Sequence, residues 1–88
     1  MRKLYIIRSP YTGRLITPRQ VTSLGCAHDH HLLKEYPPTT HDPNLDYYGV
    51  QVPSHELYET ELDAYKALTS ALMYEIKKLN HNLKDIIL

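Results

Sequence analysis

Residues 60–88 read TELDAYKALTSALMYEIKKLNHNLKDIIL, and this stretch decides the fold because it carries the one long helical pattern of the chain. It contains no Gly or Pro, and Thr60 with Asp63 three residues later has the form of a capping box at a helix start. Apolar residues recur at spacings of three and four along it, at Tyr65, Leu68, Leu72, Ile76, Leu79, Leu83 and Ile86. The pattern predicts a helix over residues 60–86.

The length of this helix is informative. A helix of about 25 residues is about 37 Å long, whereas a sheet of six-residue strands spans only about 20 Å. The C-terminal half of the apolar stripe is therefore expected to extend beyond the sheet. A homodimer seam is the simplest explanation, and packing on the chain's own loop or fraying are the alternatives. The residues predicted to form the seam are Ile76, Leu79, Leu83 and Ile86.

The preceding part of the chain has strand and turn patterns instead. β-branched, aromatic and other apolar residues gather in short runs, and Gly13 and Gly25 are placed to form a turn and to close a strand. Pro18 has no N–H to donate, so its strand is expected to lie at an edge or to bulge there. The predicted strands are residues 3–8, 15–24, 30–36 and 47–53, with a turn at 11–14 and an irregular loop at 37–46.

Strands first and one long helix last is the order of an α+β fold. We expect a small antiparallel sheet, or an SH3-like partial barrel, of about four strands, followed by a long C-terminal helix. With 88 residues the chain has the size of one domain. Within it, residues 1–58 would form a β-module and residues 60–86 the helix.

One stretch resembles known proteins. Residues 48–67, YGVQVPSHELYETELDAYKA, resemble the last strand and helix start of short, mostly uncharacterised phage and prophage proteins. Those proteins end in a motif of the form Leu-aromatic-x-Thr-x-x-x-Ala, matched here by Leu57, Tyr58, Thr60 and Ala64. The resemblance implies a β-module with a C-terminal helix and a viral or mobile-element origin, and it carries over no active site.

The composition narrows the class of protein. Apolar residues make up 42% of the chain and charged residues 23%, values typical of a globular protein. Cys26 is the single cysteine, so an intrachain disulfide is excluded and a reducing cytoplasm is expected, the host cytoplasm if the protein is viral. No apolar run reaches the roughly 20 residues that span a bilayer, and the first residues lack a signal peptide's apolar core.

A partner-binding site is expected around the Pro-rich loop. Long loops in compact domains are often functional, and rigid aromatic rings beside acidic groups suit a basic groove on another protein. The alternative is that the loop only connects two strands. The residues predicted for this site are Tyr36, Asp42, Asp46, Tyr47 and Tyr48.

The N-terminal hairpin is basic, which offers a second function. Residues 1–20 contain five basic residues and no acid, with Tyr5 and Tyr11 interleaved, so the hairpin could neutralise phosphates and stack on bases. The balanced overall charge opposes this interpretation, because nucleic-acid-binding domains are usually basic as a whole. The residues concerned are Arg2, Lys3, Arg8, Arg14 and Arg19.

A zinc-stabilised module is a third possibility. Cys and His side chains are the ligands that zinc prefers, and Cys26, His28 and His30 alternate so that an extended backbone would place them on one face, with His41 as a fourth ligand. The usual separation of paired ligands is absent, so we expect no metal and no other cofactor.

Catalytic patterns are also missing from the sequence. The three glycines are far apart, so there is no phosphate-binding loop, and no pair of carboxylates stands in an apolar setting. We therefore expect no enzymatic activity. The predicted function is that of a small phage-type accessory protein, which binds a host protein and inhibits or redirects it, for example a defence nuclease or a transcription enzyme.

Overall fold

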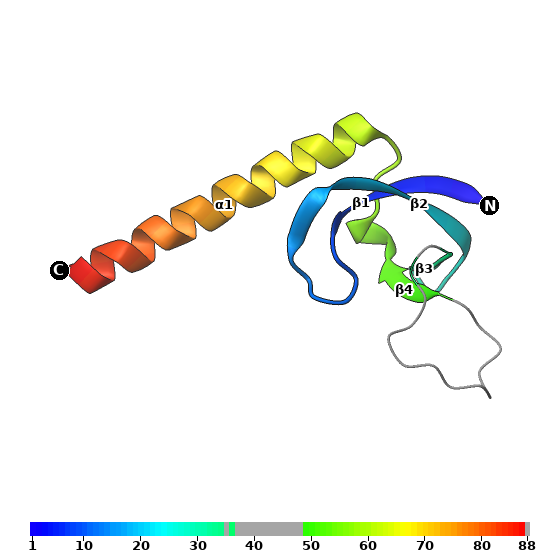
Figure 1. Cartoon of the computed structure of the whole chain (residues 1–88), viewed down its shortest axis with the longest axis horizontal. Helices are drawn as coiled ribbons and strands as arrows, with labels where there is room; N and C mark the ends of the chain where they lie inside the picture. The colour runs from blue at the N-terminus through cyan, green and yellow to red at the C-terminus, as the bar shows by residue number, and fades with distance from the viewer. Residues whose placement is uncertain (35, 37–48, 88) are drawn as a thin grey trace.

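The computed structural model describes residues 1–34, 36 and 49–87, and for residues 83–87 it describes the helical backbone only. Four strands come first, followed by one turn of 3-10 helix and a helix of 27 residues (Figure 1). The elements are β1 (Arg2–Arg8), β2 (Leu15–Ala27), β3 (His30–Leu33), β4 (Val50–Pro53), η1 (Ser54–Glu56) and α1 (Glu61–Ile87). The expected α+β fold with a long C-terminal helix is confirmed.

The four strands form one antiparallel sheet in the order β1-β2-β3-β4. After β4 and η1 the chain returns to the outer edge of β1, where the backbones of Tyr5 and Tyr58 exchange hydrogen bonds of 2.8 and 2.9 Å. This return makes the sheet a partly closed barrel, which was one of the two predicted forms. We use β-module for β1–β4 together with η1 and Tyr58.

β2 is longer than predicted, because the chain bulges at two points instead of ending. Its register against β1 shifts across the segment that contains Pro18, so the expected bulge is confirmed. A second shift, between Ser23 and Gly25, lets the strand continue to Ala27, so the prediction that Gly25 closes it was wrong. His28 and Asp29 then form the turn into β3 with φ values of 53° and 61°. Glycine or asparagine usually supplies these angles, which is why the turn was not recognised in the sequence.

β3 and β4 are shorter than the predicted strands. Lys34 already lies in a turn, and β4 begins after Gly49, whose φ is 113°. A side chain at Gly49 would overlap the carbonyl oxygen of Leu33, so only glycine fits this close approach of the two strands. Residues 47 and 48 of the predicted fourth strand lie outside the described part of the chain.

The core fills the inside of the curved sheet. It contains side chains from all four strands and from the segment after β3. Partly buried side chains of Ile16, Val50 and Leu57 pack against it. The core residues are Leu4, Ile6, Val21, Leu33, Tyr36 and Val52.

α1 covers the outside of β1 and β2 with its N-terminal half only. The Thr60 hydroxyl accepts a hydrogen bond of 3.1 Å from the backbone N–H of Asp63, which confirms the expected helix start. The helix contacts β1 and β2, and its buried or half-buried residues follow a helical spacing. We call these residues the docked face: Ala64, Ala67, Leu68 and Ala71.

Beyond Ala71, every side chain of α1 that the structure describes is exposed. The helix runs away from the β-module on one side, and this gives the molecule a longest dimension of 55 Å (Figure 1). Of the predicted apolar stripe, only Leu68 belongs to the docked face. The small alanine side chains take the place of the stripe because they let the helix approach the sheet closely.

Candidate functional site

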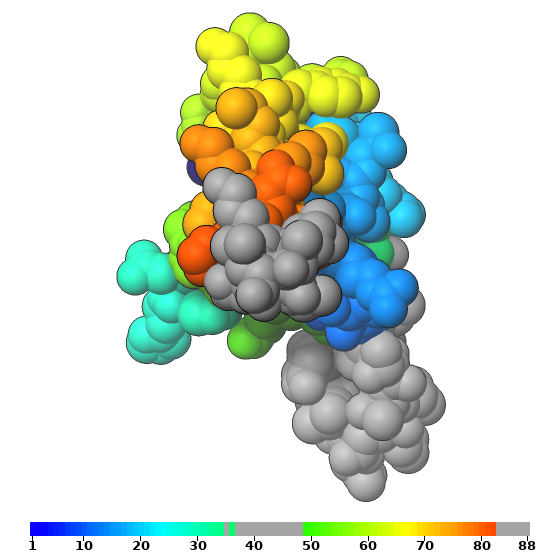
Figure 2. Space-filling view, turned by 90° about the vertical axis from the view of Figure 1, so that its left-hand side faces the viewer, coloured from blue at the N-terminus to red at the C-terminus, as the bar shows by residue number. Residues whose placement is uncertain are grey.

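The most prominent surface feature is a row of large apolar side chains along α1. Each of them is between 44% and 63% exposed. Single exposed apolar side chains are common on proteins, but a contiguous set of them marks an interaction surface more often. In Figure 2 the yellow and orange side chains of α1 form the upper part of the molecule, and no other segment lies above them in this view. We call this set the exposed apolar face: Leu62, Tyr65, Leu72, Met73, Ile76 and Leu79.

The exposed apolar face is distinct from the docked face. After Ala71, the helical positions that continue the docked face are Tyr74, Glu75, Lys78 and Asn82, all of them exposed and three of them polar. The exposed apolar face instead stays apolar through Ile76 and Leu79. The sequence therefore ends the contact with the sheet at Ala71 but keeps an apolar face where the sheet no longer reaches.

Half of the predicted dimer seam lies on this face. Ile76 is 56% exposed and Leu79 is 61% exposed. The side chains of Leu83 and Ile86 lie outside the described part of the structure. Leu62 and Met73 belong to the same surface but were not predicted. The predicted stripe begins at Tyr65 and contains only one residue per helical turn, so it leaves out Leu62 before it and Met73 beside it.

The predicted loop site is described at only one position. Tyr36 is 9% exposed and belongs to the core. Its ring meets the Tyr11 ring edge-on with centroids 6.0 Å apart, and the Arg19 guanidinium carbon lies 4.7 Å from its centroid. Tyr36 is thus held inside the β-module by these contacts. The other four predicted residues, Asp42, Asp46, Tyr47 and Tyr48, lie outside the described residues.

The basic residues of the hairpin are mostly engaged within the protein. Arg2 forms an ion pair with Glu59, which precedes α1. The Lys3 ammonium donates a hydrogen bond of 2.6 Å to the Thr22 hydroxyl, and Arg8 donates one of 2.9 Å to the Gly13 carbonyl. Arg19 stacks on Tyr36, as described above, and Arg14 is exposed next to the hairpin turn. Because these residues point to different partners at both ends of β1, they do not form one patch.

The residues proposed for zinc are similarly dispersed. Cys26 lies near the end of β2 with its sulfur 3.8 Å from the Ser54 hydroxyl, whereas His28 occupies the turn instead of an extended backbone. His30 Nδ1 contacts the carbonyl of His28 at 2.9 Å. Within residues 1–34, 36 and 49–82, no three His, Cys, Asp or Glu side chains gather as metal ligands would. His41 lies outside this range.

One Ser–His contact has the residue types of a nucleophile and a base. The Ser23 hydroxyl and His31 Nδ1 share a hydrogen bond of 2.6 Å, at the bulge where β2 faces β3. The two residues are only 3% and 9% exposed, and Ser23 also donates to the Gly25 carbonyl at 3.4 Å. A substrate cannot reach a hydroxyl at this depth, so the contact is structural: it satisfies two buried polar groups at an irregular point of the sheet.

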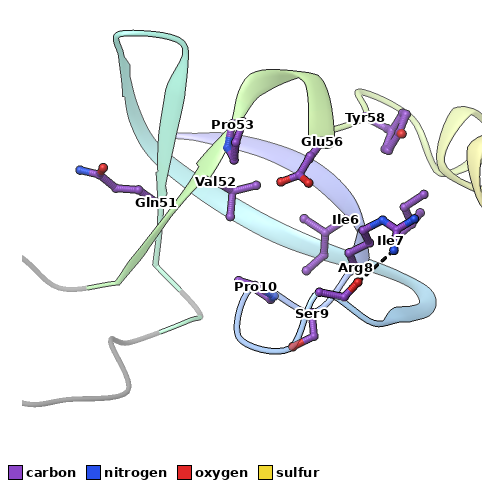
Figure 3. A pocket seen from close by; sticks show the side chains of 11 residues that line it. Ile6, Ile7, Arg8, Ser9, Pro10, Gln51, Val52, Pro53, Glu56 and Tyr58 are labelled. Atoms are coloured by element: carbon purple, nitrogen blue, oxygen red, sulfur yellow. Dashed lines mark hydrogen bonds between the residues drawn. The ribbon is translucent and has the colours of Figure 1, made fainter.

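A cavity of about 260 Å³ opens at one end of the β-module. Its walls include the buried Ile6 and Val52, and Figure 3 shows Glu56 and Tyr58 along one side and Ser9 on the other. This volume lies just below the roughly 300–1,000 Å³ of typical small-molecule sites. A second hollow of about 320 Å³, lined by Leu24, Cys26 and Leu32 among others, lies within that range.

No helix within the described residues combines the length and the apolar character needed to cross a membrane. Comparison with protein-family models, with curated proteins and with solved structures finds no match for this chain, so its function is inferred from its own surfaces.

Proposed function

We propose that this protein is a non-catalytic interaction protein in which the β-module holds α1 and the exposed apolar face of α1 binds another polypeptide chain. The observation that carries this proposal is the row of six large apolar side chains, about half exposed, on one side of a helix that leaves the sheet. Completing their burial would contribute on the order of 5–9 kcal/mol before the cost of association.

The shape of α1 adds support. The part of α1 beyond Ala71 has about 16 residues, and those of its side chains that the structure describes are all exposed. A helix of this length is only marginally stable in water on its own. Packing against a partner would stabilise it, and the exposed apolar face is the side of the helix suited to that packing. A projecting helix with an apolar face is also a recurring recognition element in protein complexes.

We propose further that the protein acts as a phage-type accessory protein in the host cytoplasm, where it binds a host protein and inhibits or redirects it. Support comes from the resemblance of residues 48–67 to short phage proteins and from the separated charges of the chain. A basic segment at residues 1–20 and an acidic one at residues 21–60 would steer the approach of a charged partner.

A matched pair of variants tests the role of the helix face. Ile76→Glu places a charge in the middle of the exposed apolar face, whereas Tyr74→Glu places the same charge on another side of α1, where Tyr74 is 70% exposed. Immobilised wild-type protein and both variants would be incubated with bacterial lysate, and retained proteins identified by mass spectrometry. We expect a protein retained by the wild type and by Tyr74→Glu to fall at least tenfold with Ile76→Glu. Equal retention by all three would show that this face binds no host protein, and would contradict the proposed role as a host-binding protein.

A further inference from the structure

The exposed side chains of α1 follow a seven-residue repeat. Leu62, Thr69 and Ile76 are seven residues apart, and so are Tyr65, Leu72 and Leu79. With the first set at the a positions and the second at the d positions, Leu83 and Ile86 continue the repeat in the sequence. The pattern covers residues 62–86, about three and a half heptads, which reaches the length that is typical of a coiled coil.

Over residues 62–82, where the structure describes the side chains, every a and d position of this seam is exposed. The docked residues Ala64, Ala67 and Ala71 occupy outer positions of the repeat, c and f, and Leu68 lies at a flanking g position. Leu62 and Tyr65, at the docked end of the helix, are still 63% and 44% exposed. A second helix can therefore contact α1 over its full length without displacing the sheet.

The residues that flank the seam identify the partner by their charge. Glu61 lies at a g position and Lys66 at the following e position, both exposed and without an ion-pair partner among the described residues. In a parallel pair of identical helices, g of one helix meets the following e of the other. Glu61 would then pair with Lys66 of the second copy, twice by symmetry.

The next flanking pairs agree with the parallel arrangement. Leu68 would meet Met73 of the second copy, which joins two apolar side chains, and Glu75 would meet Asn80, which joins two polar ones. An antiparallel arrangement of the same length would set Glu75 against its own copy, a contact between like charges. Ile at an a position between Leu residues at d, as Ile76 is between Leu72 and Leu79, favours two strands.

We propose that the exposed apolar face of α1 binds α1 of a second copy of this chain, in a parallel two-stranded coiled coil over residues 62–86. This inference rests on the proposed function and names its partner. The two-fold axis of such a pair runs along the helices. It therefore places the two β-modules on opposite sides of the helix pair and at the same end.

The mass of the full chain in solution tests the pairing. Sedimentation equilibrium over about 1–500 µM should show twice the monomer mass of 10.3 kDa at the upper concentrations. Ile76→Glu should raise the dissociation constant at least about 100-fold, because two buried charges would meet at one layer of the seam. Tyr74→Glu, at an outer f position, should leave the dissociation constant unchanged. Circular dichroism checks that both variants fold.

The orientation is tested separately by cross-linking. In a Cys26→Ser background, Leu79→Cys places a thiol at a d position, where a parallel pair brings the two copies together and an antiparallel pair does not. We expect mild oxidation to give a covalent dimer with Leu79→Cys and none with Tyr74→Cys. In addition, Glu61→Lys and Lys66→Glu should each weaken the dimer about threefold to tenfold, and the double variant should restore it.

The possible outcomes separate the two proposals. A wild-type protein that stays monomeric to the highest concentration, or a dimer unaffected by Ile76→Glu, overturns the homodimer. A dimer that Leu79→Cys does not cross-link, or a charge reversal that the double variant does not rescue, overturns the parallel arrangement. If the wild type is monomeric but Ile76→Glu still abolishes retention of a lysate protein, the helix face binds a different chain and the proposed function stands.

Discussion

Gly49 shows how a single residue controls the joining of two strands. Its backbone has a φ of 113°, and a Cβ would overlap the carbonyl oxygen of Leu33 across the sheet. We predict that Gly49→Ala lowers the free energy of unfolding by at least about 1–3 kcal/mol, because both the strained φ and the overlap must be relieved. Urea denaturation followed by circular dichroism measures the loss.

Gly25 provides the matched control for this change. It lies in the β2 bulge, its φ is not positive, and nothing stands within 4 Å of the position that a methyl group would take there. Gly25→Ala is expected to shift the unfolding midpoint little. Equal losses for the two variants would show that the Leu33 carbonyl does not set the requirement at Gly49.

The buried Ser23–His31 hydrogen bond gives a second prediction at this scale. Ser23→Ala removes the partner of His31 Nδ1 at a site almost closed to water, and an unsatisfied buried polar group costs about 1–3 kcal/mol. We expect a corresponding decrease in the free energy of unfolding. Ser70→Ala, on the exposed side of α1, should change it by less than about 0.5 kcal/mol. If Ser23→Ala leaves the free energy of unfolding unchanged, water or a backbone group must replace the hydroxyl as the partner of His31.

Single residues also show where sequence patterns lose their information. Ala64 is completely buried and is the centre of the docked face, yet alanine occurs on every side of helices and marks no direction. The large apolar residues beside it form the periodic stripe, and such a stripe usually marks the face of a helix that contacts the sheet. A helix approaches a sheet closely where its side chains are small. The pattern of large apolar residues therefore does not reveal this contact.

Among the elements, α1 has two parts that are expected to differ in stability. Its first turns rest on β1 and β2, whereas every described side chain beyond Ala71 is exposed. Hydrogen exchange should therefore show strong protection of residues 72–82 at concentrations where the coiled coil forms, and rapid exchange after dilution. The amides of Leu4 and Val21 in the core serve as the internal control, since their protection should not depend on concentration.

The strands illustrate which element features a sequence contains. The bulge at Pro18 was predictable because a missing N–H is a property of the residue itself. The continuation of β2 through Gly25 was not, since it depends on pairing with β3 across a His28–Asp29 turn in an unusual conformation. Local chemistry therefore predicted where strands bend, and long-range pairing decided where they end.

At the scale of the whole molecule, the charge distribution bears on nucleic-acid binding. If all five basic residues of the hairpin contacted phosphates, log K against log salt would have a slope of about −4.5. Arg2, Lys3 and Arg8 already hold contacts within the protein, so we predict a slope shallower than about −2 for any 20-bp duplex. Fluorescence anisotropy in a salt titration measures it. A slope near −4.5 would favour the nucleic-acid alternative over the proposed function.

The sequence indicated the candidate site only through the length of the predicted helix compared with that of the predicted sheet. A helix of this extent could not be covered by so short a sheet, which pointed to Ile76 and Leu79 without any structure. The heptad that starts at Leu62 can be recognised as exposed only when it is known which face of α1 contacts the sheet. Burial of Ala64 and exposure of Leu62, two residues apart, supplied that information.

The alanine contact also has a mechanical consequence. Three of the four docked residues are alanines, whose methyl groups interlock little with a sheet surface, while about 24 Å of helix extends beyond them. A rotation of about 10° at this fulcrum moves the far end of α1 by about 4 Å. α1 is thus a lever, and any molecule that holds its tip exerts a torque on β1 and β2, the two strands on which the helix rests.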